Sequence, residues 1–290
     1  MTAALWAAAS GIGFGLFQSL NRRAVRDIED PYVSTFLNIS IAAAALILLA
    51  VVTEDVSRVW EADGWAVAAF ATAGIVHFLL GWTFLNISQR RIGASRTSPL
   101  LTMSPVFALA VAAFTVGQIP SWLAFAAIVP MVGGAYLVAG GGSEARGADA
   151  LPGLACALMW GVSPVLTVRG LDGLDSPLLG VAIGLLAAVA AYGGFLLARR
   201  GGPRAPVIAF DALAFKVIAG VLVALATWWR WIAIDGADVA VVVSLGLLSV
   251  PVVLFLSPLL VGKHLERVTP RVWAGAGLVV GGALALIAVT

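Results

Sequence analysis

Long apolar runs constrain the fold of this chain more than any other feature. Ten of them, each at least about 17 residues long, follow one another and are separated by short polar segments. As a helix, a run of about 20 apolar residues matches the thickness of the bilayer core, so we expect ten membrane spans. They cover 3–20, 32–53, 64–87, 94–116, 119–140, 151–169, 177–198, 209–232, 238–262 and 270–289.

The composition excludes an ordinary soluble enzyme. Hydrophobic residues make up 61% of the chain and charged residues 11%, against about 45–50% and 25% in soluble proteins. Within a bilayer the backbone must satisfy its own hydrogen bonds, and the runs are too long and uniform for barrel strands. The sequence therefore predicts an all-α integral membrane protein whose partners are membrane lipid and a small-molecule substrate.

Other classes of partner are disfavoured by what the sequence lacks. A net charge of +2 is too small for a nucleic-acid binder. The single cysteine, Cys156, and the two histidines form no metal-ligand spacing, so we expect no disulfide framework, metal or other cofactor. We expect a monomer, with a dimer through the last span left open because Gly277 and Gly281 form a small-residue face.

Basic residues predict the orientation of the spans. Loops after the odd-numbered spans carry thirteen Lys or Arg, against three on the other side, which are Arg58, Arg169 and Arg230. The thirteen are Arg22, Arg23, Arg26, Arg90, Arg91, Arg96, Arg146, Arg199, Arg200, Arg204, Lys263, Arg267 and Arg271. Because basic loops stay in the cytoplasm, we expect a multi-pass protein of a bacterial inner membrane with periplasmic termini.

The two halves of the chain match in order, which predicts an internal repeat. We expect five-helix repeats at 1–142 and 150–290, joined by a linker at 143–149. With five spans in each, the second repeat enters the membrane from the opposite side, and such inverted repeats are typical of transporters. The matches pair Gly74-Ile75-Val76-His77 with Gly220-Val221-Leu222-Val223, Ser104-Pro105 with Ser249-Val250-Pro251, Val116-Gly117-Gln118 with Val261-Gly262-Lys263, and Met131–Ala135 with Val279–Ala283.

Two stripes of polar and aromatic residues are candidates for a substrate site. His77, Phe78 and Trp82 share a face of the third span, and Trp160 and Ser163 share a face of the sixth. We expect these stripes to face each other across a central cavity, where the rings hold an apolar side chain and His77 and Ser163 hydrogen-bond polar groups. The alternative is structural: a histidine bonded to a neighbouring helix and a packed tryptophan.

Prolines interrupt several spans and predict hinges. Pro105 and Pro251 occupy matching places in the fourth and ninth spans, and paired breaks in equivalent segments point to a site or hinge. Pro164 lies on the face of Trp160 and Ser163. Ser98 and Ser244 share faces with the paired prolines and are further candidates for substrate binding, although packing roles for these residues stay open.

Charges within the spans narrow the class of substrate. No Asp or Glu lies at mid-depth, which disfavours an exporter of cationic drugs. Aromatic walls with hydroxyl groups suit a neutral or zwitterionic solute. Lys216 could meet a substrate carboxylate, whereas Arg96 and Arg230 lie close to span ends and are expected to snorkel to the interface.

These motifs resemble a known family. Trp160-Gly161-Val162-Ser163, Ser104-Pro105-Val106 and the Val-Gly-Lys…Gly-Gly ending are similar to segments of EamA-type members of the drug/metabolite transporter superfamily. The resemblance implies a ten-helix secondary transporter, not an enzyme, that exports small metabolites by alternating access. It points to aromatic and other neutral amino acids. The alternatives are a multidrug or aromatic-cation exporter and, more remotely, an intramembrane enzyme using Ser163 with His77.

Overall fold

The computed structural model describes residues 2–25, 28, 30–116, 122–139, 147–199, 210–237, 242 and 245–289. Within this part of the chain every regular element is a helix. The elements are α1 Ala3–Val25, α2 Pro31–Thr53, α3 Arg58–Glu61, α4 Gly64–Gly74, the π-helix η1 Ile75–Gly81, α5 Trp82–Ile92, α6 Ala94–Leu101, α7 Ser104–Val116, α8 Trp122–Ala139, the 3₁₀-helix η2 Gly147–Ala150, α9 Leu151–Leu171, α10 Pro177–Ala198, α11 Phe210–Gly236, α13 Ser249–Val261 and α14 Pro270–Val289.

The all-α membrane class is confirmed by these helices. Among the described residues, six helical segments are long and apolar enough to cross a membrane: α1, α2, the continuous segment Gly64–Ile92, Ala148–Leu171, α10 and α11. Each of the ten predicted spans contains helix among its described residues, although the number of helices that cross a bilayer stays a prediction. Ser244, Gln118, residues 143–146 of the linker and four of the basic loop residues (Arg26, Arg146, Arg200 and Arg204) lie outside the described residues.

Local signals explain where two of the long helices begin. The carboxylate of Asp30 accepts a hydrogen bond from the backbone N–H of Tyr32 at 2.8 Å, and Pro31 opens α2. The hydroxyl of Ser176 accepts one from the N–H of Leu179 at 3.1 Å, and Pro177 opens α10. A side-chain cap satisfies a free N–H of the first turn, and proline is preformed for the first helical position.

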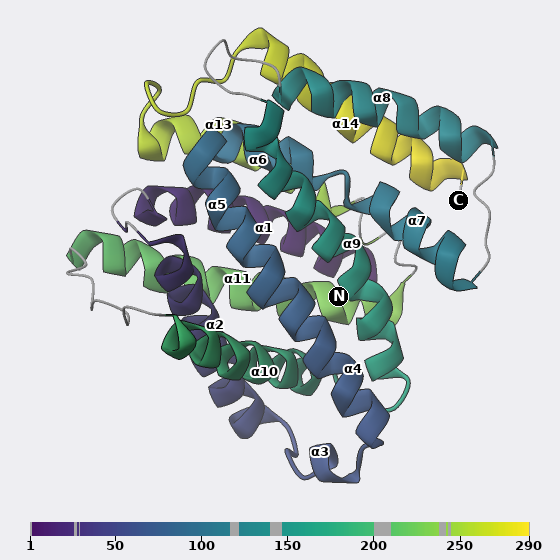
Figure 1. Cartoon of the computed structure of the whole chain (residues 1–290). Helices are drawn as coiled ribbons and strands as arrows, with labels where there is room; N and C mark the ends of the chain where they lie inside the picture. Colours follow the sequence, from purple (N-terminus) through teal and green to yellow (C-terminus); the bar gives the residue numbers. More distant parts are fainter. Residues whose placement is uncertain are drawn as a thin grey trace.

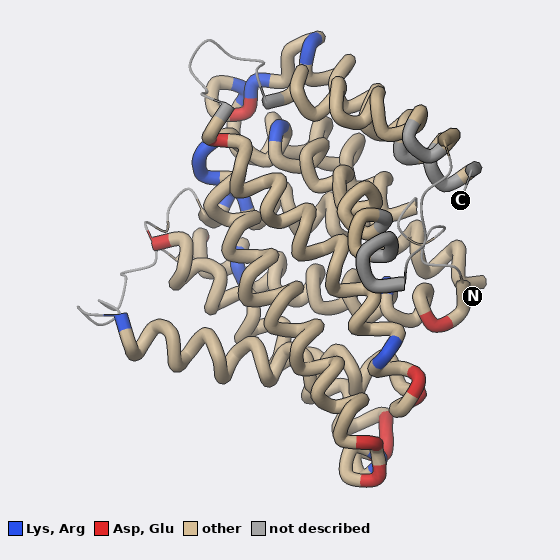
Figure 2. Tube along the Cα trace, turned by 45° about the vertical axis from the view of Figure 1, so that its right-hand side comes forward, with Lys and Arg blue, Asp and Glu red and all other residues tan. Residues whose placement is uncertain are grey.

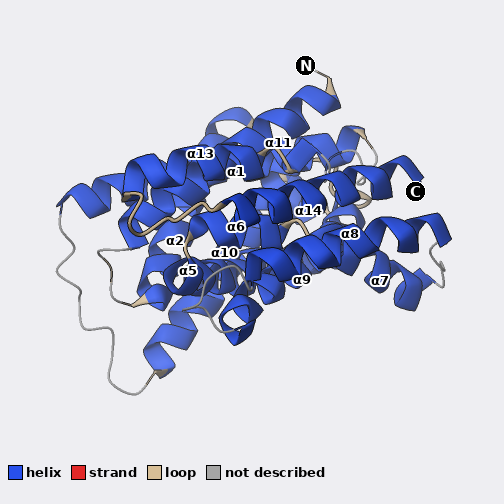
Figure 3. Ribbon diagram, turned by 90° about the horizontal axis from the view of Figure 1, so that it is seen from above, coloured by secondary structure: helices blue, strands red, loops and turns tan. Residues whose placement is uncertain are grey.

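The long helices run roughly along one direction, and both termini lie at the same end of the bundle (Figure 3). Figure 2 shows many Lys and Arg toward the upper left and most Asp and Glu toward the lower right. This separation supports a membrane normal along the bundle. The side on which the termini face stays a prediction.

Helices α8 and α14 lie side by side at the edge of the molecule, away from the centre of the bundle (Figure 1). Glycines bring them close, because a Cβ placed on Gly275 of α14 would lie 2.8 Å from the carbonyl oxygen of Gly134 in α8. Gly277 and Gly281, by contrast, have open space around them. The interior of the bundle is therefore surrounded by helices other than α8 and α14.

Candidate functional site

A turn shortly before a proline occurs at matching positions in the two halves of the chain. A turn at residues 102–103 separates α6 from α7, and another at residues 247–248 precedes α13. Pro105 has no N–H for the carbonyl of Leu101, and Pro251 has none for the carbonyl of Leu247, which instead accepts from the N–H of Val250 at 3.0 Å. The prolines therefore explain why α7 begins at Ser104 and α13 begins at Ser249.

Each break packs against a glycine of a helix from the other half. A Cβ placed on Gly15 of α1 would lie 2.9 Å from the carbonyl oxygen of Ser249. A Cβ placed on Gly161 of α9 would lie 2.6 Å from the carbonyl oxygen of Ser104. Both distances are too short for a real Cβ, so only glycine allows these backbones to approach so closely. The breaks, α1 and α9 thus meet at the centre of the molecule.

A small pocket lies where these elements meet. It has a volume of about 30 Å³, little more than the space for a water molecule. In this conformation the pocket is therefore too small for a solute of the size of an amino acid. The lining residues are Phe14, Gln18, Leu101, Thr102, Ser104, Trp160, Arg230, Gly246, Leu247 and Ser249.

Arg230 is the charged residue of this pocket. It is 9% exposed and lies in α11, and no acidic partner for it occurs among the described residues. The expectation that Arg230 snorkels to the interface is wrong. Helix α11 continues to Gly236, beyond the predicted end of the span at 232, so Arg230 lies deeper than the sequence indicated. A long side chain in a helix leans toward the N-terminus, which brings the guanidinium toward the centre.

Two more polar groups near the pocket have no hydrogen-bond partner in the described structure. They are Oε1 of Gln18, an acceptor, and Nε1 of Trp160, a donor. Both side chains line the pocket, and the ring of Phe14 lies against Trp160 with centroids 5.8 Å apart. Buried polar groups are normally paired, so unpaired ones beside a pocket indicate a place for a polar solute or water.

The two predicted stripes do come together. Nδ1 of His77 lies 2.9 Å from Oγ of Ser163, and the imidazole stacks on Trp160 with centroids 5.4 Å apart and an interplanar angle of 11°. Phe78 meets Trp82 edge to face at 5.1 Å. His77, Phe78, Trp82 and Ser163 are buried and line neither described pocket, so a cavity between the stripes stays a prediction. Of the five residues, only Trp160 lines the central pocket.

The other predicted site residues are less central. Ser98 is buried with an unpaired hydroxyl but lines neither described pocket. Ser244 lies outside the described residues. Pro164 lies within an unbroken α9, whereas Pro105 and Pro251 each follow a break. A hinge at any of these prolines stays a prediction, and so does substrate binding by the predicted residues.

Lys216 is fully buried, but it faces amides. Its Nζ donates to Oδ1 of Asn21 at 2.6 Å and to Oδ1 of Asn38 at 3.3 Å. Asn21 in turn donates to Oδ1 of Asn86 at 2.7 Å and to Oε1 of Gln89 at 2.9 Å. These contacts tie α1, α2, α5 and α11 together. Lys216 lines neither described pocket, so in this conformation it stabilises helix packing and does not contact the central space.

Five polar residues of the central lining were not predicted as site residues from the sequence: Gln18, Thr102, Ser104, Arg230 and Ser249. One signal was present for several of them: Gln18 follows Phe14 by one helical turn, and Ser104 and Ser249 stand shortly before the paired prolines. For Arg230 the sequence held no such signal, because its depth depends on where α11 ends.

Comparisons with known proteins fit this architecture. Residues 1–140 match the EamA-like transporter family. A chain from a solved crystal structure superposes with a TM-score of 0.65 at 19% identity, covering 96% of this chain and 97% of that one, which shows a shared fold.

Curated relatives are more distant. The phosphoenolpyruvate/phosphate translocator 3, chloroplastic, of Oryza sativa subsp. japonica is 25% identical over 122 residues, or 42% of this chain and 30% of the relative. The phosphoenolpyruvate/phosphate translocator 1, chloroplastic, of Arabidopsis thaliana is 26% identical over 121 residues, or 42% of this chain and 29% of the relative. The match therefore spans less than a third of each relative's length.

Proposed function

We propose that this chain, whose residues 1–140 match the EamA-like transporter family of the drug/metabolite transporter superfamily, is a secondary transporter. It would export amino acids, aromatic and other neutral ones, across a bacterial inner membrane. The observation that carries the substrate class is Arg230, a buried cation without an acidic partner among the described residues, in a central pocket lined by aromatic rings.

An amino-acid zwitterion suits this lining. The guanidinium of Arg230 offers a fork of donors that matches a carboxylate. The unpaired Oε1 of Gln18 offers an acceptor to the ammonium group, and the rings of Phe14 and Trp160 offer cation–π and apolar contacts. His77 stacks on Trp160 and does not line the pocket, so its role is to hold the indole ring in place. A wider pocket is needed before such a solute enters.

Alternating access would widen the pocket. The breaks after α6 and before α13 lie at matching positions, and each packs on a glycine of the opposite half. These paired contacts support two inverted repeats at 1–142 and 150–290 that rock about the pocket. A helix that lacks one backbone hydrogen bond bends there at lower cost, so Pro105 and Pro251 are the proposed hinges.

A multidrug or aromatic-cation exporter fits the pocket poorly. Arg230 repels a cation, and no carboxylate is among the described residues of the lining. The close contact of Ser163 with His77 is reminiscent of an enzymatic nucleophile and base. Both residues are buried outside the described pockets, however, and Nε2 of His77 has no described group to orient it. Transport is therefore favoured over catalysis.

Small phosphorylated acids are the second candidate, favoured by Arg230 and by the substrates in the names of the curated relatives. Among the described lining residues Arg230 is the single cation. A phosphate dianion is usually held by several charge-assisted donors, whereas the carboxylate of a zwitterion needs one. Because the described lining offers one cation, we favour amino acids over phosphorylated acids as substrates.

Counterflow in proteoliposomes tests the proposal. Vesicles loaded in turn with unlabelled tryptophan, threonine, phosphoenolpyruvate or a cationic dye are assayed for uptake of the same labelled solute. We expect exchange of the amino acids by the wild type and its loss in Arg230→Gln. Arg169→Gln removes the same charge from an exposed site near the end of α9 and should leave exchange unchanged.

Other outcomes would overturn the assignment. Exchange of phosphoenolpyruvate without amino acids would favour the second candidate. Exchange of the dye, or amino-acid exchange that survives Arg230→Gln, would contradict a carboxylate site at Arg230. Fusions of phosphatase and of a fluorescent protein to the C-terminus test the proposed periplasmic termini.

A further inference from the structure

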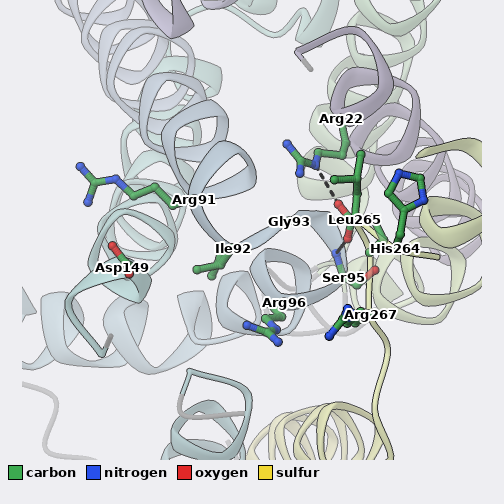
Figure 4. Close-up of a pocket in the computed structure, with 11 residues that line it drawn as sticks. Arg22, Arg91, Ile92, Gly93, Ser95, Arg96, Asp149, His264, Leu265 and Arg267 are labelled. Atoms are coloured by element: carbon green, nitrogen blue, oxygen red, sulfur yellow. Dashed lines mark hydrogen bonds and ion pairs between the residues drawn. The ribbon is translucent and has the colours of Figure 1, made fainter. Parts of the chain in front are cut away.

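A second and larger pocket lies at the basic end of the bundle (Figure 4). Its volume of about 370 Å³ is within the range of small-molecule sites. It is formed by the ends of α1 and α5, the start of α6, η2 and the segment between α13 and α14. The lining residues are Arg22, Arg91, Ile92, Gly93, Ser95, Arg96, Asp149, His264, Leu265, Glu266 and Arg267.

The lining carries a surplus of positive charge. The lining holds four arginines and two carboxylates, and one of the arginines, Arg22, is paired with Glu266. Glu266 accepts hydrogen bonds from Nε of Arg22 at 2.7 Å and from the backbone N–H of Ala94 and of Ser95 at 2.9 and 3.0 Å. Among the described residues, Arg91, Arg96 and Arg267 have no acidic partner within ion-pair distance. Arginines that outnumber the neighbouring carboxylates attract an anion.

Ser95 adds an independent indication of a ligand. Its side chain is 1% exposed, it lines the pocket, and its hydroxyl has no hydrogen-bond partner in the described structure. Figure 4 draws Ser95 beside Arg96 and Arg267. A buried hydroxyl usually finds a partner, and an anionic oxygen between the guanidinium groups would supply one.

This pocket is separate from the central one. Arg22 and Gln18 lie one turn apart on α1, which is about 6 Å along the helix axis. Gln18 lines the central pocket and Arg22 lines the basic one. Arg22 and Glu266 form a buried pair, with side chains 11% and 1% exposed, in the lining of the basic pocket and not in that of the central one. A ligand of the basic pocket therefore does not occupy the proposed amino-acid site.

We propose that the basic pocket binds a phosphate-bearing anion through Arg96, Arg267 and Ser95. Planar guanidinium groups match phosphate oxygens with paired hydrogen bonds, and a serine hydroxyl donates a further one. The same phosphate chemistry occurs in the headgroup of an anionic phospholipid and in free phosphate. The position at the basic end, which is predicted to be cytoplasmic, gives access to both sources.

The test uses the full-length protein with bound lipid removed in a neutral detergent. In one arm, inorganic phosphate is titrated at constant ionic strength and binding is followed by thermal stabilisation. In the other, phosphatidylcholine vesicles with and without phosphatidylglycerol carry the protein, and retained lipid is measured by native mass spectrometry. Arg96→Gln combined with Arg267→Gln is compared with Lys263→Gln combined with Arg271→Gln, which removes the same charge on the same side outside the lining.

We expect the Arg96/Arg267 pair of substitutions to weaken phosphate binding, or phosphatidylglycerol retention, by at least about tenfold, as when charge-assisted hydrogen bonds are lost. Ser95→Ala should weaken it by a smaller factor, and the control pair should bind as the wild type. Stabilisation by phosphate identifies a soluble ligand, and selective retention of phosphatidylglycerol alone identifies a lipid. Failure of the wild type to bind either, or equal losses in both double variants, would overturn the proposal.

Discussion

The imidazole of His77 and the hydroxyl of Ser163 lie 2.9 Å apart and form a buried hydrogen bond between η1 and α9. These segments are far apart in the sequence, and both side chains are almost fully buried. The same imidazole stacks on Trp160, which lines the central pocket. The bond therefore fixes a ring that forms part of the proposed substrate site.

Replacing either partner should destabilise the protein. Ser163→Ala leaves Nδ1 of His77 buried without a partner, which costs about 1–3 kcal/mol of unfolding free energy. A double-mutant cycle with His77→Ala should give a coupling of about 0.6 kcal/mol, the usual size for side-chain hydrogen bonds between membrane helices. Reversible unfolding in detergent measures both. Strictly additive losses would mean that the contact contributes no coupling.

Trp160→Ala should affect substrates unequally. The indole lines the central pocket and offers an apolar ring to the solute. An aromatic pair contributes about 0.5–1.5 kcal/mol beyond burial, so exchange of tryptophan should fall about two- to tenfold more than exchange of threonine. The ratio of the two counterflow rates is the measurement. An equal fall for both substrates would show that the ring only supports the fold.

The hinge prolines should control rate more than affinity. Pro105→Ala and Pro251→Ala each restore an N–H that can bond to the carbonyl of Leu101 or Leu247, and this bond stiffens the break. We expect slower counterflow with a smaller change in the dissociation constant. Pro130 lies within α8 at the edge of the bundle, so Pro130→Ala is the matched control. Wild-type rates in both hinge variants would leave these prolines as packing features.

Replacing Gly161 with a larger residue should destabilise the protein. A Cβ at this position would lie 2.6 Å from the carbonyl oxygen of Ser104, and both atoms belong to backbones that must move apart. Overpacking of this kind costs about 1–3 kcal/mol, so Gly161→Ala should lower the midpoint of thermal unfolding. A Cβ placed on Gly133 of α8 would have no atom within 4 Å, and Gly133→Ala should be neutral or stabilising. Equal midpoints for the two variants would contradict the close approach.

The carboxylate of Glu266 should be essential for stability. It engages Arg22 and two backbone amides, and Gly93, with a φ of 81°, leaves space for it. Glu266→Gln leaves a buried guanidinium without its counter-charge, which costs about 3–5 kcal/mol. Arg199→Gln breaks a 3.0 Å pair with Asp30 whose side chains are 41% and 37% exposed, and should cost less than about 1 kcal/mol. Similar losses of unfolding free energy in both variants would contradict this difference.

The sequence predicted the all-helical class and one contact between distant segments. Each of the ten apolar runs contains helix among its described residues, and the predicted depths of His77 and Ser163 indicated that they could meet. Periodicity did not predict the π-helix Ile75–Gly81, because a pattern with 3.6 residues per turn cannot reveal where the backbone widens. The sequence also placed Arg230 at an interface, since the end of an apolar run is uncertain by the few residues that separate an interface from a pocket.

What the sequence by itself determined is local: long helices, their membrane setting, and breaks before Pro105 and Pro251. Backbone hydrogen bonds in an apolar solvent must be satisfied within each segment, and a proline removes one wherever it stands. Only the tertiary structure decided which side chains meet, as in the contact of Arg22 with Glu266 and the exposure of Arg230 to the central pocket. Such meetings depend on the rotation and depth of one helix relative to another. These are set by the packing of many residues far apart in the chain, so no short segment encodes them.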